Sequence, residues 1–197
     1  MDTTQQPPAV ESRTREILRA PFTADTWKRV AYVVLALPVG ILCIPLALVG
    51  GPAGRIQRGL AGRLLGLETG EPARTGPLAL AHAVISLPIN VAAATVTCYF
   101  WLVVAINLGF PLRPDNDPTQ SWGGPTMAGA WAVHGISGGV PFLFLTPWVV
   151  KGFTTVQARL VTGLLGTDRS GLLRTTGIAL GIAALCSVLS VPIIHQF

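Results

Sequence analysis

The chain has 197 residues, of which 50% are hydrophobic and 12% are charged, and its formal net charge is +5. An ordinary soluble domain carries about a quarter charged residues, whereas here every Asp and Glu lies outside the long apolar stretches. This segregation excludes an ordinary soluble protein and predicts an all-α integral membrane protein. The positive charge indicates a lipid bilayer with anionic headgroups as the partner, and no nucleic acid, because the basic residues form no aromatic-bearing soluble module.

Residues 1–26 are polar and contain no signal peptide, so we expect a mobile cytoplasmic tail in which residues 11–20 form a short surface helix. Trp27, Lys28 and Arg29 then mark the water–lipid interface, where amphipathic rings and cations gather. Residues 27–197 are expected to form a single membrane domain.

The first apolar stretch, residues 30–50, contains Pro38 and Pro45, which remove backbone donors from the middle of a helix. Lys and Arg number five in residues 1–29, four in residues 51–76, one in 109–126 and four in 151–174. If all apolar stretches cross the membrane, the two sides receive nearly equal totals. If the first stretch is broken or re-entrant, all but one of these residues lie in the cytoplasm, as the positive-inside rule favours. We therefore expect a broken or re-entrant first segment.

Three further apolar stretches, at residues 77–108, 127–150 and 171–194, are each long enough to cross a bilayer. Together with the first they predict three to four transmembrane helices. The connection at residues 109–126 is rich in Pro, Asp and Gly, which predicts a loop, and the charge count places it on the outer face. We expect no effector domain after the last stretch.

A ten-residue pattern, Q-x-x-L-x-x-x-L-L-G, occurs at residues 57–66 and again at 157–166. As helices, both copies are amphipathic, with Leu60 and Leu64 on the apolar face of the first and Leu160 and Leu164 on that of the second. We expect two interfacial helices with these faces in the lipid, in an imperfect internal repeat: unit one at 27–70, unit two at 77–170, and a final span at 171–194. The predicted membrane-interface residues are Trp27, Arg58, Arg63, Trp148, Lys151 and Arg159.

Catalysis has few candidate residues in this chain. No carboxylate lies in a span, and HExxH, GxSxG, P-loop and GxGxxG patterns are absent from the sequence. We therefore expect no enzyme activity, no cofactor and no metal site. Candidate ligand-binding residues lie mainly in the outer loop, which joins charge to an aromatic side chain on a proline-bounded turn, with two more in the spans. They are Arg113, Asp115, Asp117, Trp122, His134 and Asn90.

Each candidate has a plain structural alternative. The loop residues suit a solvated connection tied down by its Trp at the interface. His134 suits a hydrogen-bonded packing histidine, and Asn90 suits a side chain that satisfies the carbonyl freed by Pro88.

Trp27-Lys28-Arg29-Val30-Ala31-Tyr32, leading into Leu37-Pro38-Val39-Gly40 and the first Leu-Leu-Gly, resembles the sensor domain attached to many actinobacterial histidine kinases. That family repeats a unit of a Leu-Pro membrane hairpin and an amphipathic helix ending in Leu-Leu-Gly. Here Leu87-Pro88-Ile89 would open the second unit and Leu164-Leu165-Gly166 would close it. The first unit is compressed to one apolar stretch, and a further span stands where a kinase would begin.

The resemblance implies a sensing module in a bacterial cell membrane whose output is a separate kinase or other membrane protein. We therefore expect a non-enzymatic, sensor-like or accessory regulatory module involved in signal transduction, with a homo-oligomer as a further possibility. The alternative is a small oligomeric transporter or channel subunit, because proline-broken repeats build many transport sites. A membrane-embedded lipid enzyme is the weakest hypothesis, since no acid, base or nucleophile cluster is visible.

Overall fold

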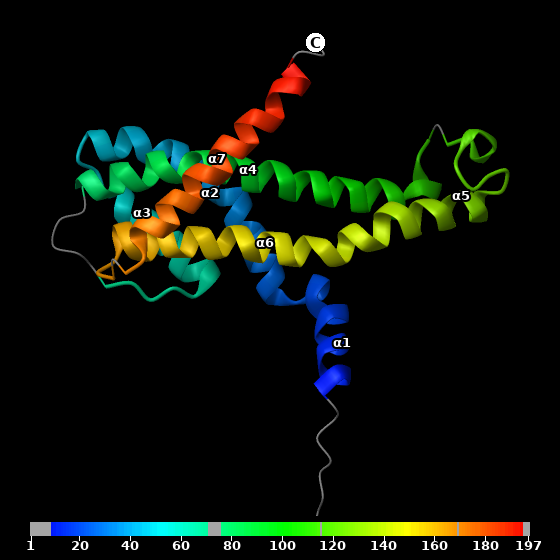
Figure 1. Ribbon diagram of the computed structural model, residues 1–197, viewed down its shortest axis with the longest axis horizontal. Helices are drawn as coiled ribbons and strands as arrows, with labels where there is room; N and C mark the ends of the chain where they lie inside the picture. The colour runs from blue at the N-terminus through cyan, green and yellow to red at the C-terminus, as the bar shows by residue number, and fades with distance from the viewer. Residues whose placement is uncertain (1–8, 71–75, 115, 169, 195–197) are drawn as a thin grey trace, which may run out of the picture. The chain divides into compact units, whose positions relative to one another are not determined.

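A computed structural model describes residues 9–70, 76–114, 116–168 and 170–194. Within these ranges every regular element is a helix, and the α-helices are labelled in Figure 1. The α-helices are α1 (Ala9–Arg19), α2 (Ala24–Leu48), α3 (Ala53–Leu65), α4 (Gly76–Leu108), α5 (Met127–His134), α6 (Val140–Leu160) and α7 (Leu172–Ile194). Short 3-10 turns are η1 (Ala20–Phe22), η2 (Phe110–Leu112) and η3 (Pro118–Gln120), and π-helical segments are η4 (Gly135–Gly139) and η5 (Val161–Leu165).

Three helical runs in the described part of the chain are long and apolar enough to cross a membrane: Ala24–Leu48, Gly76–Leu108 and Met127–Leu165. The last of these, the third long helix, consists of α5, η4, α6 and η5 in succession. This confirms the prediction of an all-helical protein with membrane-spanning helices. The predicted fourth stretch forms α7, and the short surface helix expected at residues 11–20 corresponds to α1. The tail's predicted mobility is not tested, and residues 1–8 lie outside the described ranges.

The first apolar stretch differs from the expected broken or re-entrant segment. Both prolines lie inside the continuous 25-residue helix α2. This helix runs antiparallel to α4, since Ala36 bonds to Asn90 while Val33, nearer the start of α2, shares a core cluster with Ala93, further along α4. The chain therefore does not return within α2. An interior proline removes one backbone donor, and a neighbouring helix or side chain can satisfy the freed carbonyl.

Contacts divide the chain into two compact units, each made of two separate sequence segments. One comprises residues 1–27 and 99–148, and the other residues 28–98 and 149–197. The first unit therefore contains α1 and the loop that was predicted to be on the outer face. The domain bounds expected from the repeat remain a prediction.

The second copy of the repeated pattern is not a separate helix. It continues α6 into η5 without a break, so residues 127–165 form one helical run. Its apolar side chains Leu160 and Leu164 are buried in the core of the second unit. The expectation that this face lies on lipid is therefore corrected, because it packs against protein.

The first copy forms α3, which packs against η5 of the second copy. It ends at Gly66, whose φ of 68° is the left-handed conformation that favours glycine, while its N–H bonds to Gly62 O. Ala61 and Val161, one from each copy, share a buried cluster with Tyr32. The two copies thus form one packed group within the second unit.

Candidate functional site

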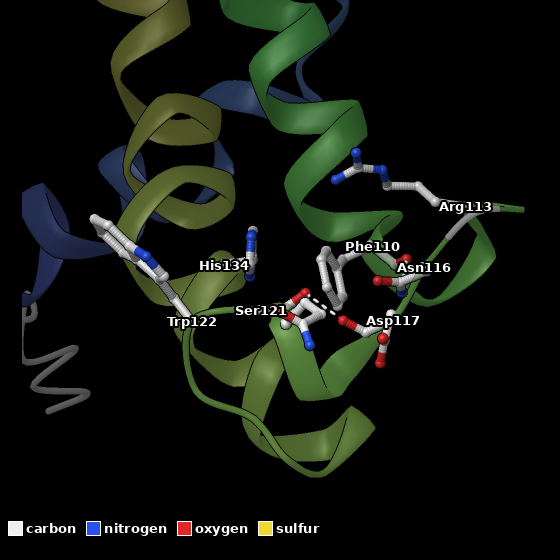
Figure 2. A pocket seen from close by; sticks show the side chains of 8 residues that line it. Phe110, Arg113, Asn116, Asp117, Ser121, Trp122 and His134 are labelled. Carbon is white, nitrogen blue, oxygen red and sulfur yellow. Dashed lines mark hydrogen bonds between the residues drawn. The ribbon is translucent and has the colours of Figure 1, made fainter.

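An open pocket of about 380 Å³ lies in the first unit, where the 109–126 loop meets the start of the third long helix. Its lining consists of Phe110, Arg113, Asn116, Asp117, Gln120, Ser121, Trp122 and His134. Figure 2 shows Arg113 and Trp122 at opposite ends of this group, with His134 and Phe110 between them. The pocket therefore brings a cation, a carboxylate, side-chain amides and aromatic rings into one space.

The loop side of the pocket is held by short-range hydrogen bonds centred on Asp117. Its carboxylate accepts from Thr119 N at 2.9 Å and Thr119 Oγ1 at 2.7 Å, which caps η3. These bonds, the side-chain one first, hold the pKa of Asp117 below its ordinary value because they stabilise the ionised form. Ser121 Oγ donates to Asp117 O at 2.8 Å, the dashed line in Figure 2. An ordered, ionised carboxylate thus lines the pocket.

The helix side of the pocket is an aromatic pair. Phe110 is 2% exposed, and its ring stacks on the His134 imidazole with 4.1 Å between centroids. His134 Nδ1 lies 2.8 Å from Ala130 O. A carbonyl oxygen only accepts, so Nδ1 carries a proton and, in the neutral ring, Nε2 is an acceptor. Arg113 completes this side, with its guanidinium carbon 5.7 Å from the centre of the Phe110 ring.

Two further bonds fix the helices beneath the pocket. Trp131 Nε1 donates to Leu108 O at 2.9 Å, which satisfies a carbonyl at the end of α4. Thr126 Oγ1 accepts from Gly129 N at 3.1 Å and caps α5. The end of α4 and the start of α5, which lie next to the pocket, are therefore each stabilised by a side-chain hydrogen bond to a backbone group.

Four of the six residues predicted to bind a ligand line this pocket: Arg113, Asp117, Trp122 and His134. Asp115 lies outside the described residues. Asn90 lies in the second unit, buried, where its Nδ2 donates to Ala36 O at 3.1 Å and its Oδ1 accepts from Gln157 Nε2. Asn90 was expected to bond the carbonyl that Pro88 frees in the same helix. This hydrogen bond instead goes to a carbonyl of α2.

The residues predicted to lie at the membrane interface differ in exposure. Arg63, Lys151 and Arg159 are exposed. Trp148 is 47% exposed, and Trp27, 49% exposed, stacks on Trp101 at 4.9 Å. Arg58 is only 8% exposed and donates through Nη1 to Leu165 O at 3.1 Å. Its side chain is therefore directed into protein, because it caps the end of the neighbouring helical run.

Sequence reasoning did not single out Phe110, Asn116, Gln120 or Ser121 as pocket residues. Asn116 and Ser121 belong to the turn chemistry already visible in the loop, and Asn116 Nδ2 donates to Phe110 O at 2.7 Å. Phe110 carries no such signal, since an apolar residue at a helix end is common. Within the described residues, no group of three or more His, Cys, Asp and Glu side chains could hold a metal ion.

Comparisons of the chain with protein-family models, with curated proteins and with solved structures give no match.

Proposed function

We propose that this chain is a non-enzymatic, multi-pass protein of a bacterial cell membrane that acts as a sensor-like or accessory regulatory module. The observation that carries the proposal is the pocket shared by the loop and the start of the third long helix, in which Arg113, Asp117 and His134 come together. The resemblance to kinase-linked sensor domains supports the same function. A separate kinase or membrane protein would receive the signal, and anionic headgroups would surround the helices.

The lining favours a small molecule that carries both an anionic group and a donor. Arg113 offers planar guanidinium donors for a carboxylate or phosphate. Asp117 offers an ionised oxygen for an ammonium or hydroxyl group, and the exposed Trp122 ring, 82% accessible, offers a flat apolar surface. We therefore propose a zwitterionic ligand of amino-acid size, which a pocket of about 380 Å³ accommodates.

Ligand binding would act on the helix packing directly below the pocket. His134 is followed at once by the π-helical segment η4, a form that is frequent at functional sites. In that segment Gly138 and Gly139 pack against Asn107 and Leu108 of α4 so closely that added Cβ atoms would lie 2.6 and 2.5 Å from their side chains. A ligand that binds two packings of these helices with different affinity would shift their populations.

The helix order and the charge of the N-terminal segment support a proposal for the side of the membrane that the pocket faces. Trp27 stacks on Trp101, so the start of α2 and the last third of α4 lie together in the first unit. We propose a cytoplasmic N-terminus, because five Lys and Arg residues precede the first apolar stretch and the first helix usually dominates orientation. The pocket then faces the cytoplasm. The expected outer position depended on the first segment returning.

The test uses the full chain in lipid nanodiscs and a panel of amino acids, dicarboxylates and phosphorylated amino acids as probes. The part of the tryptophan fluorescence lost in Trp122→Phe reports on Trp122, and we expect a saturable change in that part with at least one zwitterionic probe. Arg113→Gln should weaken the response by about tenfold or more, as expected for a charged hydrogen bond. Arg159→Gln, an exposed cation in the other unit, is the matched control.

An unchanged response in Arg113→Gln would contradict the pocket as the binding site. Mild-detergent purification from the native membrane, followed by mass spectrometry, tests the regulatory role. A near-stoichiometric kinase or membrane protein would support it, whereas a homo-oligomer without partners would favour the second candidate.

That second candidate, a small oligomeric transporter or channel subunit, is favoured by the prolines inside all three long helices, at Pro38 and Pro45, Pro88, and Pro147. Prolines interrupt the helices that form many transport sites. Flux of the same probes in reconstituted liposomes separates the candidates, since a sensor module binds without transporting.

A further inference from the structure

One face of α3, in the second unit, carries apolar and basic side chains together. Its positions are three or four residues apart, which places them on the same side of the helix. Ile56 is 42% exposed, and Arg55, Gly59 and Arg63 are exposed as well. Leu60 is half-buried, because it packs against a core cluster of the same unit. Within the described residues, protein therefore covers this face only in part.

An open groove of about 440 Å³ lies along this face of α3, and Val39 of α2 belongs to its lining. Val39, Ile56 and Leu60 give the groove an apolar wall. Arg55 and Arg63 give it two positive charges, and no carboxylate is among the described residues that line it. The groove therefore suits a molecule that has both an apolar part and a negative charge.

Gly59 leaves space between the two arginines. Arg55, Gly59 and Arg63 are four residues apart, so they form one row along α3. A Cβ atom at Gly59 would meet no other atom within 4 Å, so the space over the middle of this row is open. An anionic group that lies over the glycine is therefore next to both basic side chains.

These two arginines differ from Arg58 in their bonding. Arg58 is buried and donates to Leu165 O. The guanidinium groups of Arg55 and Arg63 have no hydrogen-bond or ion-pair partner among the described residues. Their N–H donors are therefore available to a phosphate, which a guanidinium group can bind through two parallel hydrogen bonds.

The second copy of the repeated pattern lacks this surface. Thr155 and Gly163 occupy the positions that correspond to Arg55 and Arg63. The apolar face of the second copy is also buried in the core of the second unit. The helical motif and its packing therefore do not require the two cations.

We propose that this groove binds one anionic phospholipid. Its phosphate takes donors from Arg55 and Arg63 over Gly59, and an acyl chain lies against Ile56 and Leu60. A phospholipid fits better than a soluble anion, because an acyl chain also removes the apolar wall from water. The site rests on the membrane location in the proposed function and not on ligand binding in the first unit, so the two binding sites can fail separately.

The test counts lipids bound to the full chain, purified in mild detergent, by native mass spectrometry. The probes are dioleoyl phosphatidylglycerol, which is anionic, and dioleoyl phosphatidylcholine, which is zwitterionic. We expect one phosphatidylglycerol to bind about tenfold more tightly than phosphatidylcholine. Arg55→Gln combined with Arg63→Gln should abolish this preference. Arg15→Gln combined with Arg19→Gln, which removes two exposed cations of α1 in the other unit, is the matched control and should retain it.

Three results would overturn the proposal. Equal binding of the two lipids by the wild-type chain would show that the groove does not select an anionic headgroup. Equal loss of the preference in the control would show that total charge, and not the groove, determines lipid binding. Displacement of phosphatidylglycerol by inorganic phosphate at equal concentration would show that the occupant is a soluble anion.

Gly59→Leu tests the groove without a change in charge. The added side chain occupies the groove, and it has space because a Cβ atom there meets nothing within 4 Å. It also replaces a poor helix former, so α3 should remain folded. We expect phosphatidylglycerol binding to weaken by about tenfold. Gly152→Leu, the same change at an open position of α6, is the control and should bind like the wild type. Unchanged binding in a folded Gly59→Leu variant would contradict the groove as the lipid site.

Discussion

Arg58 is a buried cation that connects the two motif copies through a hydrogen bond to a backbone carbonyl. Its Nη1 donates to Leu165 O at 3.1 Å, at the end of η5, where backbone carbonyls lack helical partners. Arg58→Ala should lower the free energy of unfolding by about 1.5–3 kcal/mol, the usual contribution of a hydrogen bond to a charged group. Chemical unfolding in detergent micelles, followed by circular dichroism, measures this loss.

Arg55→Ala is the control for this prediction, because Arg55 is exposed on the same helix. We expect a change within about 0.5 kcal/mol for such a surface position. Equal losses in the two variants would show that general helix propensity, and not the bond to Leu165, determines the stability of α3.

Asp117 stabilises its turn in a pH-dependent way. Its pKa is lowered by bonds from Thr119, so the folded turn favours the ionised carboxylate. The stabilisation is present above the ordinary carboxyl pKa and is lost as the pH falls through the lowered value. Thr119→Val removes the hydroxyl donor and should raise the pKa of Asp117 toward its ordinary value, as measured by ¹³C NMR of the carboxyl carbon. Thr155→Val, which changes a hydroxyl that bonds Lys151 O, should leave that pKa unchanged.

Among single residues, turn chemistry was the informative signal in the sequence. Arg113, Asp117 and Trp122 stood out because they interrupt a Pro- and Gly-rich connection, and they do line one pocket. The stacking of Phe110 on His134 was not visible, because it joins residues from two helix ends that only the tertiary structure brings together. Gln57 and Gln157 carried a signal that was not used: the same polar residue at the same position of both copies, where each side chain hydrogen-bonds to α4.

At the scale of helices, η4 allows two backbones to approach closely. Gly139 is buried, and a Cβ there would lie 2.5 Å from Leu108 Cδ2 and 3.3 Å from Leu108 N. Gly139→Ala should therefore destabilise the protein by about 1–3 kcal/mol through overpacking. Gly152→Ala in α6 meets nothing within 4 Å and should stabilise by up to about 1 kcal/mol through helix propensity. Thermal unfolding in micelles compares them, and effects of the same sign would contradict the close approach.

The positions of the long helices were predictable, because a long apolar run bounded by charged residues is typical of a membrane-spanning helix. The continuity of the third long helix was not predicted. Residues 151–160 contain Lys151, Gly152 and Arg159, which suggested a membrane boundary and a new helix. In the structure the helical run continues to Leu165, because Leu160 and Leu164 are buried against other helices of the second unit and do not need lipid. Burial against neighbouring helices therefore explains why the third long helix continues past Lys151, which the composition of the sequence did not predict.

At the scale of the whole chain, the charge count and the helix order lead to different topologies. The count favoured a returning first segment, because only that arrangement collects almost all Lys and Arg on one side. The count treats every basic residue as solvated near a headgroup. Arg58 is instead buried and bonded to a backbone carbonyl, so it contributes little to that preference. The charge count still favours the returning segment without Arg58, whereas the continuity of α2 and its antiparallel order with α4 favour a crossing first segment.

The resulting topology predicts the location of two positions in the chain. With a cytoplasmic N-terminus and a crossing α2, a reporter fused after Gly70 should lie outside the cytoplasm, and one fused after Gln120 should lie inside. Alkaline phosphatase, active only outside, and green fluorescent protein, fluorescent only inside, should give opposite patterns at the two positions. The opposite result, Gly70 inside and Gln120 outside, would still mean that α4 crosses the membrane. If α2 also crosses, that result would place the N-terminus outside the cytoplasm and contradict the proposed orientation. The returning segment gives this same pattern, so a reporter at the N-terminus of the full chain is needed to separate the two topologies.

A fluorescent reporter attached to the N-terminus of the full chain tests the side of the N-terminus, because this fusion retains every helix. Fluorescence there, together with a phosphatase-active Gly70 fusion, requires α2 to cross, since the two ends of one helix then lie on opposite sides. Fluorescence at both positions would restore the returning segment, and the pocket would then lie outside, because α4 alone would separate Gly70 from the loop.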